Sequence, residues 1–310
     1  MIDVSCILVN YNSSEYTIKC VESIIANTKE DTSFEIVVVD NASTLENYRI
    51  LEAGITEINS PKVILTRSLL NTGFGGGNML GVEKASPCRY FAFINNDTLL
   101  VSPDTLRELV LFMENHSNAG MCSPQMLDHD GNFRRTIDHF ASPARELLKR
   151  GFLELVNPKR FPNRKKTYSQ PLKVDYVQGA FMFTDAKAFL DIGGFDTNLF
   201  LYYEESDVCR RLLKQKQKVA YLVPQLEYIH YESASSSSNM VMKIEQKISL
   251  FYYLRKHFGS LGFKTVQIYF GIRYFFRSLV KPKYWKLFKL VWAGMPLKHS
   301  LKHKQTILDA

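Results

Sequence analysis

Short apolar runs rich in β-branched residues alternate with helix-like segments through the first 115 residues, and this alternation restricts the possible folds most strongly. The strand-like runs are Val4–Val9, Glu35–Val39, Lys62–Thr66 and Tyr90–Ile94. The segments with helical spacing are Glu15–Ala26, Tyr48–Ile58 and Pro103–Asn115. Strands that alternate with helices predict an α/β fold with a Rossmann-like, doubly wound and mostly parallel central sheet.

Polar residues follow three of these strands directly. Asn10, Asp40 and Asp97 each stand at or just after the carboxyl end of a predicted strand. In a doubly wound sheet these ends share one edge, and ligands bind beyond it. We therefore expect a binding site at this edge. Asp40 could accept hydrogen bonds from a ribose or a base, or it could cap the next helix, and the pattern allows both.

The second half of the chain is less regular. The expected elements are a strand at Val174–Thr184, helices at Asp185–Asp191 and Ser206–Gln215, and a strand at Val219–Val223. Residues 134–170 are basic and lack a clear period, which predicts loops and a helix. Residues 233–238 are polar and predict a flexible loop.

Four glycines stand in the segment Asn71–Asn78, which leads into a predicted helix. Glycines let a backbone approach a ligand closely, and the amino terminus of a helix attracts phosphate. The segment lacks the GK[ST] ending of a P-loop and follows the third strand, so it does not match a dinucleotide fingerprint. A phosphate-binding turn and a simple flexible turn both fit the pattern.

Three carboxylates and two arginines fall within eight consecutive residues, from Glu204 to Arg211. Acids beside an apolar wall such as Leu199–Leu201 suit proton abstraction, because burial raises the pKa of a carboxylate. The same residues also suit an ordinary helix start, with acids in the first turn and ion pairs along the helix.

Two further positions indicate a metal ion. Asn95-Asn96-Asp97 resembles a short motif that holds a metal and a diphosphate, and a carboxylate there suits Mg²⁺ or Mn²⁺. His230 ends a strand-like run and could add an imidazole ligand. Each position also has an ordinary structural explanation, a turn for the first and a structural histidine for the second.

Positive charge is concentrated at the carboxyl end. The chain carries a formal net charge of +8, and residues 246–308 contain 13 Lys or Arg and no Asp or Glu. Aromatic residues alternate with these cations through Gly262–Lys289. This composition predicts contact with an anionic membrane surface, or a packed helical subdomain whose cations are solvated. No nucleic-acid module is recognisable, so we expect no nucleic-acid partner.

The sequence also bears on the compartment. The five cysteines are scattered and form no CxxC pair, which predicts a reduced compartment and no disulfide framework. The amino terminus lacks a basic region, and no run of 18 or more apolar residues occurs. We expect a cytoplasmic protein that is peripheral at the inner face of the cell membrane.

The order and spacing of these residues over about 1–235 resemble the inverting glycosyltransferases of family 2, which have the GT-A fold. The resemblance is greatest to the rhamnosyltransferase-type branch that builds bacterial surface polysaccharides. The segments that carry it are Val9–Asn12, Val38–Ser43, Asn71–Asn78, Asn95–Asp97, Val177–Ala180, Gly193–Asp196 and Tyr203–Asp207, with His230 at the end.

The resemblance implies roles for individual residues. Glu205 would be the catalytic base, with Glu204 as the second candidate, although the family has Asp at the position of Glu205. Asp97 and His230 would hold Mg²⁺ or Mn²⁺, although Asn95 stands where the family's motif often begins with Asp. The residues implied in nucleotide-sugar binding are Asn10, Asn12, Asp40, Asn41, Asn71, Gly73, Gly75, Asn78, Asn96, Asp97 and Gly179.

The implied activity is transfer of a sugar from a nucleotide-sugar donor to a lipid-linked saccharide acceptor, with dTDP-rhamnose as the preferred donor. A transferase that uses another donor, such as UDP-galactofuranose or UDP-hexose, is one alternative. A nucleotide-sugar-binding protein without turnover is another, and the acid cluster argues against it, since binding alone needs no base. We expect residues 1–240 to form the GT-A domain and residues 241–310 a basic, aromatic-rich helical extension.

Overall fold

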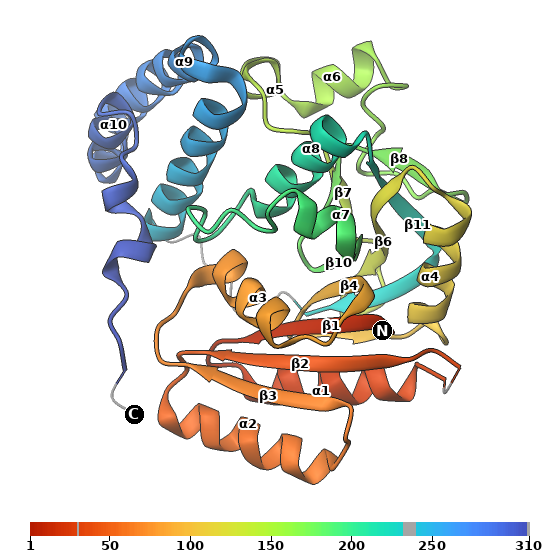
Figure 1. The fold of residues 1–310 in the computed structure, drawn as a ribbon. Coiled ribbons are helices and arrows are strands. Elements are labelled where there is room, and N and C mark those ends of the chain that lie inside the picture. Colours follow the sequence, from red (N-terminus) through yellow and green to blue (C-terminus); the bar gives the residue numbers. More distant parts are fainter. Residues whose placement is uncertain (30, 232–239, 309–310) are drawn as a thin grey trace.

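The computed structural model describes residues 1–29, 31–231 and 240–308, and the predicted loop at 233–238 lies outside them. Within this part, nine strands form one central sheet (Figure 1). They are, in chain order, β1 (Ile2–Asn10), β2 (Phe34–Asn41), β3 (Val63–Ser68), β4 (Cys88–Asn95), β5 (Thr98–Leu100), β6 (Ala119–Leu127), β8 (Leu172–Val174), β10 (Phe181–Asp185) and β11 (Val219–His230). Their spatial order is β3-β2-β1-β4-β10-β6-β11-β5, with β8 beside β11.

The register brings the polar strand ends together, as the sequence predicts. β1 lies between β2 and β4 and runs parallel to both, with Asn10 opposite Asp40 and Val9 opposite Asn95. β3 continues the parallel arrangement beside β2, whereas β10 runs antiparallel to β4 and β6. The predicted α/β fold with a mostly parallel sheet is confirmed.

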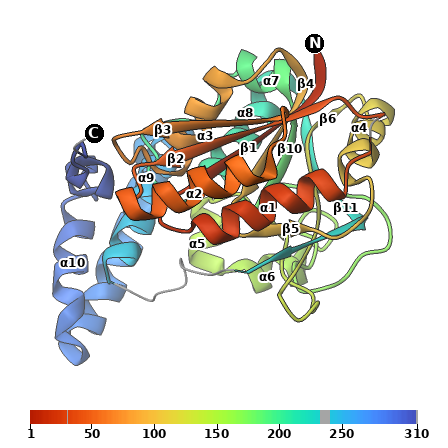
Figure 2. The same ribbon diagram turned by 90° about the horizontal axis from the view of Figure 1, so that it is seen from below.

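Helices cover both faces of the sheet. Those that flank it are α1 (Ser14–Ala26), α2 (Leu45–Ile58), α3 (Gly73–Lys84), α4 (Thr105–Asn115), α7 (Ala186–Asp191) and α8 (Glu204–Lys216). Figure 2 shows α1 and α2 together on one face, with α3, α7 and α8 on the other. Val21 and Ile24 of α1 are fully buried in one core, and Phe189 of α7 is fully buried in the second. This burial of one stripe per helix stabilises the layered arrangement.

The strand predicted at Val174–Thr184 is wrong as a single element, because the chain changes its partner strand twice. β8 ends at Val174 beside β11, the short β9 (Tyr176–Val177) pairs with β7 (Ile137–Asp138), and β10 then enters the main sheet at Phe181. The run is mostly apolar and buried, so alternation of polar and apolar residues does not mark the breaks.

The glycine-rich segment forms the first turns of α3 rather than a loop that precedes the helix. A Cβ on Gly73, whose φ is +74°, would lie 2.2 Å from the carbonyl oxygen of Phe200. A Cβ on Gly77 would lie 2.8 Å from Cγ1 of Val9. The glycines therefore let α3 pack closely against β1 and the segment around Phe200.

The basic segment after β6 is partly helical. It contains α5 (Pro143–Leu148) and α6 (Arg150–Val156), and irregular chain follows to β8. The side chain of Ser142 accepts the N–H of Arg145 at 3.0 Å and so caps α5, and Pro143 takes its first position.

The carboxyl-terminal extension is helical. It consists of α9 (Met240–Val280), which bends at Gly259, and α10 (Trp285–Trp292), with short 3₁₀ turns at Pro282–Tyr284, Leu297–His299 and Leu301–Lys304. Its buried aromatic and aliphatic side chains form a separate core, which includes Phe251, Phe270 and Leu287. Other large apolar side chains, such as Phe276 and Trp292, are exposed. Within the described residues, no helix combines the length and hydropathy needed to cross a membrane.

Candidate active site

Two adjoining cavities open at the carboxyl ends of the strands. The small cavity, of about 420 Å³, and the large cavity, of about 900 Å³, share Phe74, Asn95 and Leu201 in their walls. The other residues of the small cavity are Val9, Tyr11, Ser13, Asn41, Asn71, Gly73, Asn78, Ile94, Asn96, Asp97, Phe200, Met242, Leu301 and Gln305. Those of the large cavity are Met126, Phe133, Arg134, Arg135, Asp138, Arg150, Arg164, Lys165, Gln178, Gly179, Ala180, Tyr202, Glu204, Glu205 and His230.

The small cavity brings together most of the residues expected to bind a nucleotide sugar. The side chain of Asn41 fixes this wall, because its amide donates to Asn71 Oδ1 at 3.2 Å and to the carbonyl of Gly73 at 3.1 Å. Its Oδ1 accepts the N–H of Thr72 at 3.0 Å. The expected residues that line this cavity are Asn41, Asn71, Gly73, Asn78, Asn96 and Asp97. Gly179 lines the large cavity instead.

Four expected binding residues line neither cavity: Asn10, Asn12, Asp40 and Gly75. The side chains of Asn10 and Asp40 are fully buried, and Asn10 Nδ2 donates to Asp40 Oδ1 at 2.9 Å. Arg67 lies 3.5 Å from the same carboxylate. Gly75 packs against Phe195. The buried Asn10, Asp40 and Gly75 therefore support the cavity wall from behind, whereas Asn12 is exposed and its Oδ1 accepts the N–H of Thr44 at 2.9 Å.

Asp97 and His230 form a pair between the two cavities. His230 Nε2 lies 3.0 Å from Asp97 Oδ1, and the amide of Asn95 lies 3.3 Å from the same nitrogen. His230 Nδ1 is buried and has no hydrogen-bond partner in the described structure. Among the described residues, no group of three or more His, Cys, Asp or Glu side chains could hold a metal ion. A carboxylate and an imidazole suit a divalent cation whose other ligands are diphosphate oxygens and water.

Glu204 and Glu205 open α8 at the wall of the large cavity. The two preceding residues, Tyr202 and Tyr203, have φ of +76° and +74°. Residues other than glycine rarely adopt this backbone conformation, and such strain is concentrated at functional sites. The turn aims the carboxylates at the cavity, while the amino terminus of α8 favours their negative charge.

The two glutamates differ in burial. Glu204 is 2% exposed, and its Oε1 has no hydrogen-bond partner in the described structure. Burial, and then the charge of Glu205, raise the pKa of Glu204 well above its usual value. Burial raises the pKa of Glu205 to about 7, and the charge of Asp138 acts in the same direction. Glu205 is only partly buried, so it is the carboxylate that a substrate can reach.

The third acid of the cluster, Asp207, has a structural role. Burial by itself raises its pKa, but the contact with His257 at 2.7 Å and the charges of Arg211 and Lys256 lower it to about 2. Because His257 and Lys256 belong to α9, Asp207 joins α8 to the extension. An ionised carboxylate with three cationic or polar partners is a poor proton acceptor.

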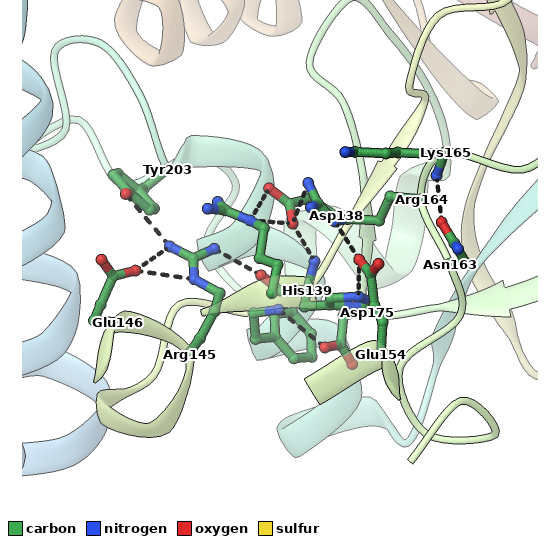
Figure 3. Close-up of polar contacts among 12 residues, drawn as sticks. Asp138, His139, Arg145, Glu146, Glu154, Asn163, Arg164, Lys165, Asp175 and Tyr203 are labelled. Atoms are coloured by element: carbon green, nitrogen blue, oxygen red, sulfur yellow. Dashed lines mark hydrogen bonds and ion pairs between the residues drawn. The ribbon is translucent and has the colours of Figure 1, made fainter. Parts of the chain in front are cut away.

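A basic wall from the segment between β6 and β8 was not expected at the site. Arg134, Arg135, Arg150, Arg164 and Lys165 all line the large cavity. The arginine and lysine clusters were visible in the sequence, but nothing local placed them near Glu205. Figure 3 shows the network of ion pairs that holds part of this wall.

The extension also contributes to the small cavity, through Met242, Leu301 and Gln305. The buried side chain of Glu245 holds this segment, because it accepts the hydroxyl of Ser300 at 2.7 Å and the N–H of Leu301 at 2.8 Å. No pattern in the sequence connects these positions with Asp97, which lies more than 140 residues before Met242 and more than 200 residues before Leu301.

Comparison with known proteins identifies relatives of the chain. It matches the family model of glycosyl transferase family 2 over residues 5–193. It is 27% identical over 238 residues to the rhamnosyltransferase WbbL of Escherichia coli (strain K12), and this alignment covers 73% of this chain and 82% of that protein. It is 28% identical over 216 residues to the low-salt glycan biosynthesis hexosyltransferase Agl10 of Haloferax volcanii, which covers 69% of this chain and 62% of that protein.

Solved glycosyltransferase structures share the fold. The structure of GalNAc-T7 with UDP, GalNAc and Mn²⁺ superposes with a TM-score of 0.59 at 15% identity, over 83% of this chain and 50% of that one. The structure of the mannosyltransferase PcManGT from Pyrobaculum calidifontis, in complex with GDP-Man and Mn²⁺, superposes with a TM-score of 0.58 at 13% identity. This superposition covers 96% of this chain and 89% of that one. The family model covers more than half of the chain, which therefore belongs to glycosyl transferase family 2 and has the GT-A fold.

Proposed function

We propose that this enzyme transfers a hexose from a nucleotide-sugar donor to a lipid-linked saccharide acceptor in the synthesis of a bacterial surface polysaccharide. The similarity to the rhamnosyltransferase WbbL over 73% of the chain supports dTDP-rhamnose as the donor. The similarity to the hexosyltransferase Agl10 supports a second candidate, in which the donor is UDP-galactofuranose or a UDP-hexose.

The observation that carries the proposal is the position of Glu205. Its partly exposed carboxylate lines the large cavity, which adjoins the small cavity that Asp97 lines. A pKa of about 7 makes Glu205 a useful base near neutral pH. Binding alone requires no such group, so this position favours turnover over a protein that only binds nucleotide sugars.

In the proposed reaction the donor lies in the small cavity and the acceptor in the large one. Glu205 accepts the proton of the acceptor hydroxyl as its oxygen attacks the anomeric carbon from the face opposite the nucleotide. One bond forms and one breaks at that carbon, so its configuration inverts. Burial and the charge of Glu205 raise the pKa of Glu204 and so favour its protonated form, which leaves Glu205 as the negative base beside the acceptor.

The departing nucleoside diphosphate needs charge stabilisation. Asp97 and His230 would hold Mg²⁺ or Mn²⁺, which when bound neutralises diphosphate charge. The amide of Asn95 lies within 3.3 Å of His230 and keeps the imidazole in place. Asn71 and Asn78, with the amino terminus of α3, present polar groups to the same cavity.

A donor panel tests this function. The purified enzyme is incubated with each nucleotide sugar and a lipid-linked acceptor, and release of nucleoside diphosphate is measured. We expect dTDP-rhamnose to be turned over fastest and the product to have the inverted anomeric configuration by NMR. The Glu205→Gln variant should bind the donor normally and transfer almost none of it. Turnover of the donor by that variant at the normal rate would contradict the proposed role.

A further proposal concerns the membrane. The extension exposes Ile272, Phe276 and Trp292, and its residues 246–308 carry cations without a single acid. Exposed apolar side chains with surrounding cations suit the interface of an anionic bilayer. The extension would then bring the large cavity close to a membrane-bound acceptor.

A further inference from the structure

The large cavity carries more positive charge than its own acids neutralise. The wall has five cations and three acids, Asp138, Glu204 and Glu205. Asp138 pairs with two of the cations, since Arg150 Nε lies 2.7 Å and Arg164 Nη1 3.5 Å from Asp138 Oδ1. Arg134 pairs with Asp128 at 3.2 Å, outside the cavity wall. For Arg135 and Lys165 the described structure gives no ion pair.

The wall that carries these cations is fixed by buried contacts. Arg164 donates to Glu154 Oε1 at 2.7 Å, and the same oxygen lies 3.3 Å from His139 Nε2 (Figure 3). Arg145 donates to the carbonyl of His139 at 2.7 Å and lies 3.4 Å from the hydroxyl of Tyr203. This network joins the basic wall to the start of α8. Gln125 Nε2 donates to the carbonyl of Arg134 at 2.7 Å and so fixes the backbone next to Arg135. The exposed side chains of Arg135 and Lys165 therefore extend from a fixed backbone, which reduces the entropy lost when a ligand binds.

The excess charge predicts an anionic ligand in the large cavity. In the proposed function, the small cavity and the Asp97–His230 pair bind the nucleoside diphosphate of the donor. The large cavity contains Glu205, which must meet the acceptor hydroxyl. The anion that faces Arg135 and Lys165 therefore belongs to the acceptor.

Apolar side chains next to the basic wall favour a lipid over a phosphate polymer. α6 begins at the cavity residue Arg150 and exposes Phe152, Leu155 and Val156, with Leu155 80% exposed. The preceding α5 exposes Leu147 and Leu148. Large apolar side chains concentrated on two short helices indicate an apolar partner. A hydrophilic phosphodiester polymer would make no use of them.

We propose that Arg135 and Lys165 form a subsite for the diphosphate of a lipid diphosphate-linked acceptor, whose chain contacts the exposed side chains of α5 and α6. This inference rests on the proposed transferase function and specifies the chemical class of its acceptor. Guanidinium and ammonium groups bind diphosphate through charge-assisted hydrogen bonds. A diphosphate held there would fix the saccharide that it carries beside Glu205.

Binding of farnesyl diphosphate tests the subsite without turnover. Calorimetry is performed in a chelator, so that no metal ion assists binding at Asp97. We expect the double variant R135A/K165A to bind farnesyl diphosphate at least tenfold more weakly than the wild type. The control K159A/K166A removes the same charge from exposed residues of the same segment that do not line the cavity, and it should change affinity less than twofold. The charge-conserving R135K should retain most of the affinity.

Two further probes separate the parts of the subsite. The double variant F152S/L155S should weaken binding of farnesyl diphosphate and leave binding of inorganic pyrophosphate unchanged. A ribitol-phosphate oligomer should bind more weakly than farnesyl diphosphate to the wild type. Tighter binding of the oligomer would contradict a lipid acceptor and indicate a phosphate polymer as the ligand. Normal binding of farnesyl diphosphate by R135A/K165A would contradict the subsite itself.

Kinetics then connect the subsite with transfer. The same saccharide is offered on farnesyl diphosphate and as an uncharged farnesyl glycoside. R135A/K165A should raise KM at least tenfold for the first acceptor only, with an unchanged KM for the donor. Equal losses with both acceptors would contradict the inference while leaving the transferase function intact. The protein could also bind farnesyl diphosphate through Arg135 and Lys165 but turn over none of the nucleotide sugars. That result would contradict the transferase function and leave the subsite intact.

Discussion

Replacement of Glu205 by Gln should abolish transfer and at the same time stabilise the fold above neutral pH. The folded state raises the pKa of this carboxyl from 4.5 to about 7, so the folded protein binds the proton more tightly than the unfolded chain. The contribution of Glu205 to stability is then fully present below pH 4.5 and is lost as the pH rises to 7. At about 1.4 kcal/mol per pKa unit, the free energy of unfolding of the wild type falls by up to about 3 kcal/mol between pH 4.5 and pH 8. The Gln variant has no such loss. Solvent in the cavity reduces this upper value.

The assay compares urea unfolding of both proteins at pH 5 and pH 8, together with kcat/KM of the wild type between pH 5.5 and pH 9. We expect the variant to gain stability over the wild type mainly at pH 8. We expect kcat/KM of the wild type to fall about tenfold per pH unit below 7, because the protonated carboxyl cannot act as a base. Since Glu204 and Glu205 interact, the observed midpoint belongs to the pair.

Asp207→Asn is the matched control on the same helix, and its effect should have the opposite sign. The pKa of Asp207 is lowered to about 2, so its stabilising contribution is present above pH 3.8 and lost as the pH falls toward 2. The free energy of unfolding of the Asn variant at pH 8 should be about 2 kcal/mol lower than that of the wild type. The reasoning about Glu205 is refuted if Glu205→Gln is as destabilising at pH 8 as Asp207→Asn, or if it retains transfer activity.

Three further outcomes are expected from the site and the extension. Asp97→Ala should weaken binding of the nucleoside diphosphate at least tenfold by calorimetry with Mn²⁺, and full activity in excess chelator would exclude the proposed metal. Glu245→Ala should raise KM for the donor, because it removes two hydrogen bonds that hold Ser300 and Leu301 at the small cavity; an unchanged donor KM would show that the segment is dispensable. The double variant I272S/F276S should pellet less with anionic vesicles at high salt, where attraction between charges is screened, and equal pelleting would exclude these side chains from the membrane contact.

The edge of the sheet could be predicted from the sequence because its signals are local. Each strand is a short β-branched run that ends at a polar residue, and parallel strands bring such ends together. The strand ends therefore predict Asn10, Asp40 and Asp97 at this edge, whereas Glu205 is predicted from the acid cluster that opens α8. The division of Val174–Thr184 could not be predicted, because its breaks depend on which strands lie beside it rather than on its own residues.

The remainder of the site depends on tertiary packing. The sequence predicts a phosphate-binding or flexible turn at Gly75 and Gly77, because a glycine that accommodates a ligand and one that accommodates a neighbouring side chain have the same sequence signature. Arg135 and Lys165 lie 30 residues apart in an irregular segment without a period, and only the tertiary structure brings both to the wall of the large cavity. Gln305 reaches the small cavity only because α9 bends back at Gly259.

The place of Leu301 and Gln305 in the small cavity has a consequence for regulation. They belong to the extension proposed to meet the membrane, yet they line the cavity proposed for the donor. The backbone N–H of Leu308 also donates to the carbonyl of Leu69 at 2.8 Å, beside the Asn71 wall. A surface that orders the extension would then increase the affinity for donor, and a bound donor would increase the affinity for that surface by the same factor. Coupling of this kind would confine efficient transfer to enzyme molecules that are already at the membrane.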